Sequence, residues 1–527
     1  METALIAQKT RDSFLNLIAD TLDKKKQALV FVNTKKSAEK QAEDIAKYIK
    51  KGNEAQNELA RKILGVLSQP THQCARLAGC IRAGTAFHHS GLHPRQRELI
   101  EDNFRDGNIR IICATPTLAA GVDLPAYRSI IKDLKRFDGN YGMVPIPILE
   151  YQQMIGRAGR PSFDNVGEGI CIAKSESEKD EIYRRYVLGA PEEIYSKLAA
   201  EPALRMYLLS LLAGDFVSSK VEIMNFFKKT FWAHQYRDLG ELQNILEQQL
   251  ANLEGWLFVK KVGGPRSSDF VSADEVGNEV YKATSLGMRV SELYLDPLTA
   301  HGFVTSLDRA REVTLTPFGC VHLICTTKEM FPLLHVKTKE WDTIAQKSLE
   351  HMPNLLVSEP SLYDPDYEEF LDADKTACMF HDWMEENTEQ YLLDTYDVRP
   401  GETRNKLDIA QWLFRCLIEM GRVLNTDKKI LSEINRARIR LKNGVKDELV
   451  PLVKFRNIGR VRARKLFANK IQSIADVKRV DLTMLRQLVG LKVALSLKEQ
   501  VGEKTPDIPK QGKRKGQFGL ARFDTGF

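Results

Sequence analysis

Residues 109–125 read IRIICATPTLAAGVDLP, an apolar run that ends at a threonine and continues into a segment of small residues. A short run of this kind, apolar apart from Arg110, is typical of a strand buried on both faces, as in a parallel sheet. Similar runs are ALVFVN (28–33), TAFHHS (85–90), SIIKDL (129–134) and EGICIAK (168–174). Helical patterns at 35–51 and 94–107 lie between them. This alternation predicts a parallel α/β lobe over residues 1–194.

Helical patterns dominate the chain after residue 195, so the predicted fold class is multidomain α/β plus α. Three helical segments, the last running through LGELQNILEQQLANLEGWLFVKK (239–261), precede a polar loop and a short YKAT segment. This order predicts a winged helix over 195–294 with 239–255 as its recognition helix, although a plain helical hairpin fits the same periodicity. We expect a helical bundle over 295–444, with a long helix beginning near Gly401.

The C-terminal region divides into a structured part and a tail. Residues 445–500 contain a helix, an Ile-Gly turn and a second helix, which predicts a helix–hairpin–helix. Residues 501–527 are rich in lysine, glycine and proline, and we expect them to be disordered.

Length and composition narrow the class of protein. The 527 residues exceed what one core supports, so three or four domains are expected. No apolar run approaches the roughly 20 residues that span a bilayer, and the N-terminus lacks the apolar core of a signal peptide. The eight cysteines are scattered without a CxxC pair, which indicates reduced thiols and a cytoplasmic protein without a membrane segment.

The charge is unevenly distributed along the chain. Residues 428–470 contain fourteen lysines and arginines against three acids, whereas 359–397 contain thirteen acids against one lysine. A basic segment beside an acidic one suggests a polyanion that is bound in one place and repelled in another. Two solvated helix faces would give the same counts.

The segment QMIGRAGR (153–160) places Arg157 and Arg160 among small residues that let a loop approach a ligand closely. Guanidinium groups are planar, permanently charged donors for phosphate oxygens, and such arginines stabilise charge on a transferring γ-phosphoryl group. As a bare pattern, GRAGR also fits a surface turn.

Four blocks together resemble motifs IV to VI in the second RecA-like lobe of superfamily-two helicases. These blocks are QALVFVNTKKSAEKQA (27–42), TAFHHSGLHPRQRELIEDNFRDG (85–107), ATPTLAAGVDLP (114–125) and QMIGRAGR (153–160). Three further stretches narrow the resemblance: ATSLGMRVSELYLDPLTA (283–300), GETRNKLDIAQWLF (401–414) and IGRVRARKLF (458–467). From about residue 10 to 500 the chain resembles the archaeal Ski-like repair helicases related to the helicase half of DNA polymerase theta. That family consists of 3′-to-5′ DNA translocases that act at stalled forks.

The resemblance implies roles for residues of the lobe. Arg157 and Arg160 would be arginine fingers, with Gln153 beside the nucleotide. Gly121 and Asp123 would couple DNA contact to the nucleotide state. Thr34 and Thr115 would contact DNA phosphates, which position a strand without reading its sequence.

The resemblance also implies a strand-separating hairpin in KDLKRFDGNYGMVPIPI (132–148). Phe137, Tyr141 and Met143 would wedge a base pair, with Asp138-Gly139-Asn140 at the turn. An ordinary hairpin that caps a sheet edge is the alternative.

In the segment that resembles the family's ratchet helix, Trp412 would stack on a base and Arg404 would hold a neighbouring phosphate. The family has its basic residue seven positions before the tryptophan, where this chain has Asn405. A buried structural Trp412 is the alternative.

Basic residues of the helix–hairpin–helix would bind DNA phosphate around its glycine turn. They are Arg460, Arg462, Arg464 and Lys465, and the stretch RARIRLK, with Arg436, Arg438, Arg440 and Lys442, would extend the surface. In the tail, QFGLARFD matches the outline of a sliding-clamp-binding peptide through Gln517, Leu520 and Phe523. Asp524 stands where such peptides usually have a second aromatic residue.

A metal site is not predicted. Cys74, Cys80, His88 and His89 are the candidate ligands, but their spacing fits no common zinc pattern.

A superfamily-two motor needs a GxxxxGK[ST] loop and a DExH box, and the chain contains neither. We therefore expect ATP and Mg²⁺ to be held mainly by a first RecA-like lobe, in cis or in trans. The chain is interpreted as the C-terminal part of a 3′-to-5′ DNA helicase, inactive alone, with single-stranded and forked DNA and a sliding clamp as partners. The alternatives are a non-catalytic binding module for forks or single strands and an RNA helicase of the exosome-associated group.

Overall fold

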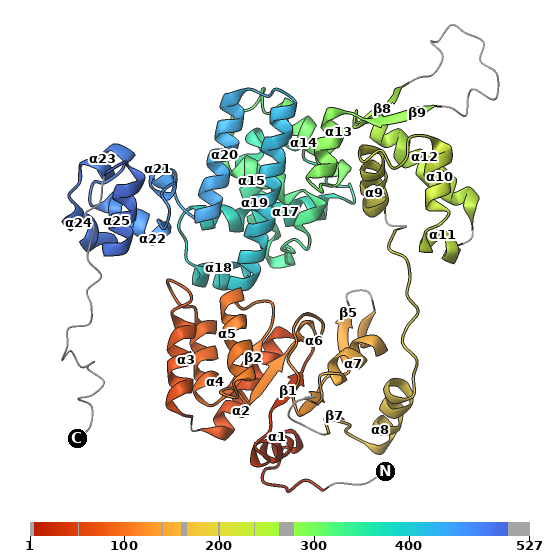
Figure 1. The fold of residues 1–527 in the computed structure, drawn as a ribbon, viewed down its shortest axis with the longest axis vertical. Helices are drawn as coiled ribbons and strands as arrows, with labels where there is room; N and C mark the ends of the chain where they lie inside the picture. Colours follow the sequence, from red (N-terminus) through yellow and green to blue (C-terminus); the bar gives the residue numbers. More distant parts are fainter. Residues whose placement is uncertain are drawn as a thin grey trace. The chain divides into compact units, whose positions relative to one another are not determined.

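The computed structural model describes residues 5–50, 52–138, 141–159, 166–198, 201–236, 238–262 and 279–503. It divides into two compact units, residues 1–442 and 443–527, and each is described by itself (Figure 1). The second predicted finger Arg160, the hairpin turn 139–140 and the clamp-like residues Gln517, Leu520 and Phe523 lie outside the described residues.

Within the described residues, five strands form one parallel sheet, as predicted. They are β1 (Ala28–Phe31), β2 (Thr85–His88), β3 (Ile111–Ala114), β4 (Arg128–Ile131) and β7 (Glu168–Cys171), in the order β2-β3-β1-β4-β7. In register, Phe31 of β1 lies between Ala114 of β3 and Ile131 of β4. The first four strands are buried along their whole length, which explains why they read as continuous apolar runs.

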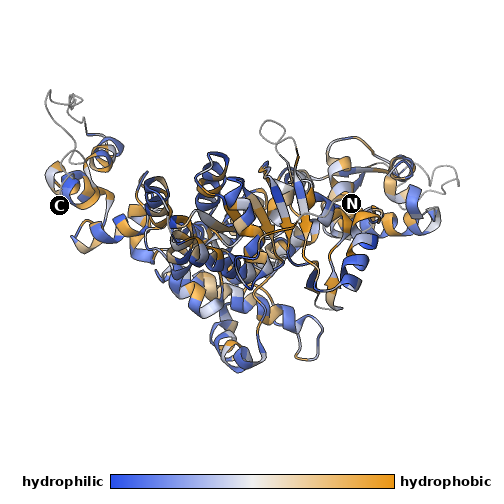
Figure 2. Ribbon diagram, turned by 90° about the horizontal axis from the view of Figure 1, so that it is seen from below, coloured by the Kyte–Doolittle hydropathy of each residue, from blue (hydrophilic) through white to orange (hydrophobic). Residues whose placement is uncertain are grey.

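Helices of the lobe surround this sheet, and most of them bury an apolar face in its core. They are α1 (Ser13–Asp23), α2 (Lys35–Ile49), α3 (Glu54–Leu64), α4 (His72–Arg82), α5 (Pro94–Arg105), α6 (Thr117–Gly121), α7 (Ile148–Ile155) and α8 (Glu176–Ile182). Helix α2 buries Ala38, Ala42 and Ile45, at helical spacing. These residues join Phe31, Phe87 and the other sheet residues in one core. Figure 2 shows apolar and hydrophilic residues alternating along the helices in the same way.

A separate hairpin, β5 (Lys135–Asp138) with β6 (Gly142–Pro145), follows β4. Its strands are antiparallel, and Phe137 pairs in register with Met143. Among the strands that the structure describes, β5 and β6 bond only to each other. The hairpin therefore does not cap the edge of the large sheet.

The next region contains four helices and a two-stranded ribbon. The elements are α9 (Glu201–Ala213), α10 (Lys220–Phe227), α11 (Phe231–Tyr236), α12 (Leu239–Gly255), β8 (Val259–Val262) and β9 (Val280–Ala283). Helix α12 has the bounds predicted for the recognition helix, 239–255, and the residues up to Lys261 that the helical pattern also included contain the start of strand β8 at Val259. Leu257 takes a left-handed backbone conformation with φ of 61°, which breaks the helix before the β-branched residues.

A helical bundle completes the first unit. Its helices are α13 (Ser285–Glu292), α14 (Pro297–Arg309), α15 (Pro317–Cys325), α16 (Trp341–His351), α17 (Tyr367–Met384), α18 (Glu389–Tyr396), α19 (Pro400–Val423) and α20 (Lys428–Asn443). The long helix predicted near Gly401 is α19. Its residues Leu407 and Phe414 share one buried core with Phe303 of α14 and Phe380 of α17. In the part of the chain described, no helix is both long and apolar enough to cross a membrane.

The second unit consists of short helices joined by tight turns. They are α21 (Val450–Val453), α22 (Arg460–Ala468), α23 (Ile474–Arg479), α24 (Leu482–Val489) and α25 (Leu491–Gln500). Asn457 precedes α22 with φ of 66°, and Gly490 joins α24 to α25 with φ of 86°. The second value suits glycine, which has no Cβ to clash.

Candidate nucleic-acid interface

The carboxyl ends of three neighbouring strands meet at one cavity of about 920 Å³. Asn33 and Thr34 follow β1, Ser90 follows β2, and Thr115 follows β3, and all four line the cavity. Ligands of open α/β sheets bind at this edge because the loops that leave parallel strands converge there. The structure thus brings together Thr34 and Thr115, which the sequence predicted as phosphate contacts.

Hydroxyl groups and helix N-termini give this cavity an anion-binding character. The Thr34 side chain accepts a 3.0 Å hydrogen bond from the Ser37 N–H and caps α2. Its hydroxyl hydrogen is free to rotate toward a ligand. The Thr115 hydroxyl lies 3.0 Å from that of Thr117, at the start of α6. Phosphate oxygens are favoured by such donors and by the positive end of a helix dipole.

Cationic side chains also line the cavity, and ion pairs hold them in place. Lys35 contacts Glu402, Lys36 lies 3.5 Å from Asp397, and Arg136 lies 2.8 Å from Glu150. Arg399, which precedes α19, lines the cavity from the bundle side. Sequence patterns do not identify Arg399, because it belongs to no recognisable motif and is distant in sequence from Thr34. Only the fold brings it there.

A buried cluster lies behind Arg399. The Glu39 carboxylate accepts hydrogen bonds from Gln73 at 2.8 Å and Arg76 at 2.6 Å, and Arg399 Nε lies 3.6 Å away. Burial alone would raise the pKa of Glu39, but His89, Gln73 and Arg76 favour its charged form and lower the pKa to about 2. Burial lowers the pKa of His89. A carboxylate that stays ionised therefore connects the lobe to the start of α19.

The predicted finger Arg157 lies against α6 rather than in the cavity. Its Nε donates a 3.0 Å hydrogen bond to the carbonyl oxygen of Ala119, and its Nη1 lies 3.8 Å from Asp123. The side chain of Asp123 is 95% exposed and that of Arg157 is 23% exposed, so the carboxylate faces solvent while the guanidinium is largely covered. Gly121 ends α6 nearby. The structure thus groups Arg157, Gly121 and Asp123.

Backbone hydrogen bonds hold the GRAGR loop against the segment that leaves β3. The Ala126 N–H donates to the Arg157 carbonyl at 2.9 Å, and the Gly159 N–H donates to the Ala126 carbonyl at 2.7 Å. Gly159 has φ of 96°, a conformation that favours glycine. Gln153, one turn before Arg157, instead lines the cavity with Thr34 and Thr115. Of the predicted nucleotide contacts, Gln153 therefore lines the cavity, whereas Arg157, which follows α7, contacts α6.

The hairpin presents apolar side chains to solvent beside the cavity. Phe137 is 75% exposed, Tyr141 81% and Met143 63%, and Arg136 of the same strand lines the cavity. Exposed large apolar groups that gather in one place mark an interaction site.

The predicted ratchet residues lie two turns apart on α19. Trp412 is half-buried against the bundle core, and its Nε1 donates a 3.3 Å hydrogen bond to the carbonyl oxygen of Leu293. Arg404 is exposed and lies 3.2 Å from Asp408. Trp412 therefore has a structural contact, whether or not its ring also stacks on a base.

The second unit carries the basic turn predicted there. Helix α22 begins after Gly459 without a side-chain cap. Arg462 donates to the Asn457 carbonyl at 2.9 Å, Arg464 lies 3.0 Å from Glu448, and Lys465 is exposed. Arg460 is the first residue of the helix. Uncapped N–H groups beside arginines can bind a phosphate.

Part of the RARIRLK prediction is wrong. Arg440 is only 7% exposed and lies 2.9 Å from Glu385 of α17. A buried cation is held by an opposite charge, so Arg440 anchors α20 and does not extend a basic surface.

The four candidate zinc ligands have other contacts. His88 Nε2 lies 2.9 Å from Glu101, His89 lies beside Glu39, and the hydroxyl of Thr71 lies 3.3 Å from Cys74. Burial raises the pKa of Cys80 to about 12. The described residues contain no group of three or more His, Cys, Asp or Glu that could hold a metal.

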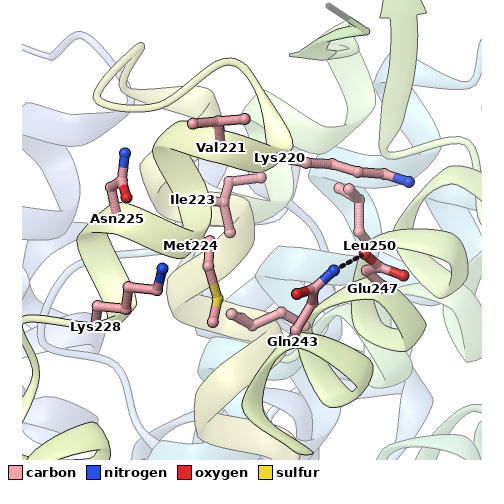
Figure 3. Close-up of a pocket in the computed structure, with 10 residues that line it drawn as sticks. Lys220, Val221, Ile223, Met224, Asn225, Lys228, Gln243, Glu247 and Leu250 are labelled. Carbon is pink, nitrogen blue, oxygen red and sulfur yellow. Dashed lines mark hydrogen bonds between the residues drawn. The ribbon is translucent and has the colours of Figure 1, made fainter. Parts of the chain in front are cut away.

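Helix α12, predicted as a recognition helix, has glutamates but no lysine or arginine over its length. Its Gln243 donates a 3.0 Å hydrogen bond to Glu247, and both line a cavity of about 280 Å³ shared with Lys220 and Met224 of α10 (Figure 3). Binding of a phosphate backbone depends on cations, so the composition of α12 opposes such a role.

Two segments of the chain match models of known helicase families, and the whole chain has curated relatives. Residues 66–162 match the model of the helicase conserved C-terminal domain, and residues 318–444 match that of archaeal helicase domain 4. The chain is 37% identical to the ATP-dependent DNA helicase Hel308 of Methanocella arvoryzae over 97% of its own length and 68% of the relative's. It is 35% identical to the Hel308 helicase of Methanococcus vannielii over 89% of this chain and 65% of the relative. It is 34% identical to the Hel308 helicase of Pyrococcus abyssi over 95% of this chain and 68% of the relative. The chain thus spans about two thirds of the length of these relatives.

Proposed function

The chain belongs to the archaeal Hel308 family of superfamily-two DNA helicases, and from this we propose that it binds single-stranded DNA and supplies an arginine finger for a 3′-to-5′ motor. The motor would hydrolyse ATP and act on forked DNA during repair in the cytoplasm. ATP and Mg²⁺ would be held mainly by a first RecA-like lobe, in cis or in trans.

The observation that supports this proposal best is the cavity at the carboxyl edge of the sheet. It combines the hydroxyl groups of Thr34 and Thr115 with the cations Lys35, Lys36 and Arg399. Donors of this type bind the backbone of a strand without reading its bases. A translocase needs such contacts because it must move along any sequence.

Arg157 would link the strand to the nucleotide. Its guanidinium is bonded to the carbonyl of Ala119, four residues after Thr115. When the lobes close, we expect Arg157 to exchange this carbonyl for oxygens of the γ-phosphoryl group, whose developing charge it would stabilise. Release of Ala119 would free α6 to move, together with Gly121 and Asp123. The grip of Thr115 on the strand would then depend on the nucleotide state. Gln153 and Arg160 would complete the nucleotide contacts.

The hairpin would separate the duplex at the entrance to this cavity. Phe137, Tyr141 and Met143 would stack on the last base pair, because exposed aromatic and thioether groups replace the stacking that a separated base loses. The strand would then pass Arg404 and Trp412 on α19. Residues 195–294 would form a winged helix and 445–500 a helix–hairpin–helix, whose basic helix α22 would also bind phosphates of DNA. Gln517, Leu520 and Phe523 would bind a sliding clamp.

One observation favours a second candidate, a non-catalytic module that binds single strands or forks. Arg157 is held by Ala119, and a chain that only binds DNA would leave it there. An RNA helicase has less support, because the relatives compared are named DNA helicases.

Binding of a labelled single-stranded oligonucleotide to the whole chain tests the proposed grip. Thr115→Val removes the hydroxyl but keeps the shape of the side chain. A hydrogen bond to a charged group contributes about 1.5–3 kcal/mol, so the variant should bind at least about tenfold more weakly. Thr34→Val is less informative, because it also removes the cap of α2.

Thr305→Val is the matched control, since the Thr305 hydroxyl only bonds carbonyl groups of its own helix α14. Equal binding by the two variants would show that Thr115 does not contact the strand.

A further inference from the structure

Helices α19 and α20 join as a helical hairpin (Figure 1). A cavity of about 840 Å³ lies where they join. The proposed function does not use it. Its polar lining consists of Arg422, Asn425, Thr426, Asp427, Lys428, Ser432, Asn435 and Arg438.

Positive charge predominates in this cavity. Arg422, Lys428 and Arg438 line it together with one acid, Asp427. The Asp427 carboxylate already accepts a 2.8 Å hydrogen bond from the Lys429 N–H at the start of α20. Arg422 contacts Glu419 one turn before it on α19. The acids nearby are thus engaged, and a net positive field remains.

Arg438 is the least favourably placed of these cations. It is half-buried, and its Nε donates a 3.1 Å hydrogen bond to Asn435. Burial, and then the neighbouring guanidinium of Arg415, lower the pKa of Arg438. Across the described ranges neither Arg415 nor Arg438 has a carboxylate within ion-pair distance. Two guanidinium groups in proximity without a counterion are stabilised when an anion binds between them.

The position of these arginines along α19 indicates which anion. With 100° of rotation per residue, Arg415 lies about 20° from Arg404 around the helix axis and Arg422 lies on the same line as Arg404. All three are exposed, and the row extends for about 27 Å at 1.5 Å per residue. The amide of Gln411 donates to the Arg438 carbonyl at 3.1 Å, which places α20 beside this row.

Cations spaced along a row fit a polymer of phosphates better than a single ion. A free phosphate needs donors that converge on one point, whereas a nucleic-acid strand presents a phosphate at every nucleotide. The row begins at Arg404, one of the residues predicted to contact the strand together with Trp412. Because the row of arginines continues from the segment predicted to bind the single strand, the same strand is the favoured ligand of the row.

We propose that Arg422, Lys428 and Arg438, which line the α19–α20 cavity, bind backbone phosphates of the single strand beyond Trp412 together with Arg415 of the same row. We call these four residues the α19–α20 cation pocket. This inference rests on the proposed function and assigns it a further binding site. The pocket reads no sequence, because it presents only cations and amides to the backbone. With this pocket, the surface of α19 that binds the strand extends from Arg404 and Trp412 toward the C-terminal end of the helix.

The salt dependence of binding measures the contacts directly. The affinity of the whole chain for a labelled single strand is measured over a range of salt concentrations. The variants are Arg415→Gln and the double variant Arg415→Gln/Arg438→Gln. Each lost phosphate contact should make the slope of log K against log salt shallower by about 0.7. Each lost contact should also weaken binding about fivefold, relative to the wild type, at 0.1 M salt.

The matched control is Arg311→Gln, which removes an equal charge from an exposed arginine that pairs with Asp308. It should leave the slope unchanged. Thermal unfolding shows whether the double variant is folded, and the single Arg415→Gln variant, at an exposed site, tests the pocket in any case.

Each other outcome contradicts the pocket in a distinguishable way. If Trp412→Ala weakens binding but both arginine variants keep the wild-type slope, the strand does not reach the pocket and the proposed function stands. If orthophosphate binds the wild type but not the double variant, with the DNA slope unchanged, the pocket is a small-anion site. If the wild type binds no single strand at all, the pocket and the proposed function are both wrong.

Discussion

The N–H of Gly401 donates a 3.0 Å hydrogen bond to the carbonyl oxygen of Gly91. This bond joins the first turn of α19 to the loop that follows β2, so the helix proposed to hold the strand begins against the lobe that binds it. A Cβ on Gly401 would overlap the carbonyl oxygens of Ser90 and Leu92. The close approach therefore requires glycine.

The Gly401→Ala substitution should lower the free energy of unfolding by about 1–3 kcal/mol, as overpacking of rigid backbone does. Chemical denaturation of the whole chain measures this change. Gly302→Ala is the control, because Gly302 is inside α14 and a Cβ there meets no atom within 4 Å. It should stabilise the chain by about 0.5–1 kcal/mol. Stabilisation by both substitutions would show that the lobe and α19 are not in contact in solution.

Stability should fall in acid because of Glu39. Its pKa is about 2 in the folded chain and near 4.5 when unfolded. The contribution of the ionised carboxylate is therefore complete above about pH 4.5 and is lost as the pH falls toward 2. The shift corresponds to a free energy on the order of 3 kcal/mol. Thermal unfolding at several pH values should show this loss in the wild type. The Glu39→Gln variant should be less stable than the wild type at neutral pH, and its stability should change less with pH across this range. If the stability of Glu39→Gln falls as steeply in acid as that of the wild type, the loss is caused by other carboxyl groups.

Substitution of the hairpin residues should uncouple strand separation from binding. Phe137→Ala with Met143→Ala removes stacking that contributes about 1–3 kcal/mol per base. In the presence of a first lobe, unwinding of a forked duplex should slow about five- to hundredfold, while binding of single strands is unchanged. Tyr363→Ala removes an aromatic residue that is 96% exposed elsewhere and should leave both unchanged. Normal unwinding by the double variant would contradict the wedge.

Trp412 offers a test that separates stacking from packing. Trp412→Ala should weaken single-strand binding about five- to hundredfold. Trp412→Phe keeps a ring but leaves the Leu293 carbonyl without its indole donor, so it should cost about 1 kcal/mol of stability while binding falls less. If the two variants lose affinity equally and only in proportion to stability, Trp412 is a structural residue.

The sequence predicted the large sheet well because its strands are short apolar runs bounded by loops, and because strands buried on both faces need no alternation. The start of α19 was equally clear, since Pro400 suits the first turn of a helix. The helix predicted over 239–255 also has the bounds of α12, although the sequence does not show that Leu257 adopts the left-handed conformation that follows it.

Long-range contacts were the main limit on prediction of the site. Thr34 and Thr115 could be predicted because each follows a strand, whereas Arg399 reaches the same cavity from a distant helix. Spacing alone could not show that Arg440 is buried against Glu385, since a solvated basic face and a buried ion pair have the same pattern.

The most direct test of the central claim is ATP hydrolysis on single-stranded DNA by this chain mixed with a separately expressed first lobe of the Methanocella arvoryzae relative. We expect hydrolysis by the mixture, and a fall of about 10³–10⁵ in kcat for Arg157→Ala with single-strand binding unchanged. Hydrolysis at an undiminished rate with Arg157→Ala would contradict the assigned finger. No hydrolysis by the mixture, with single strands still bound tightly, would contradict the motor and leave a binding module.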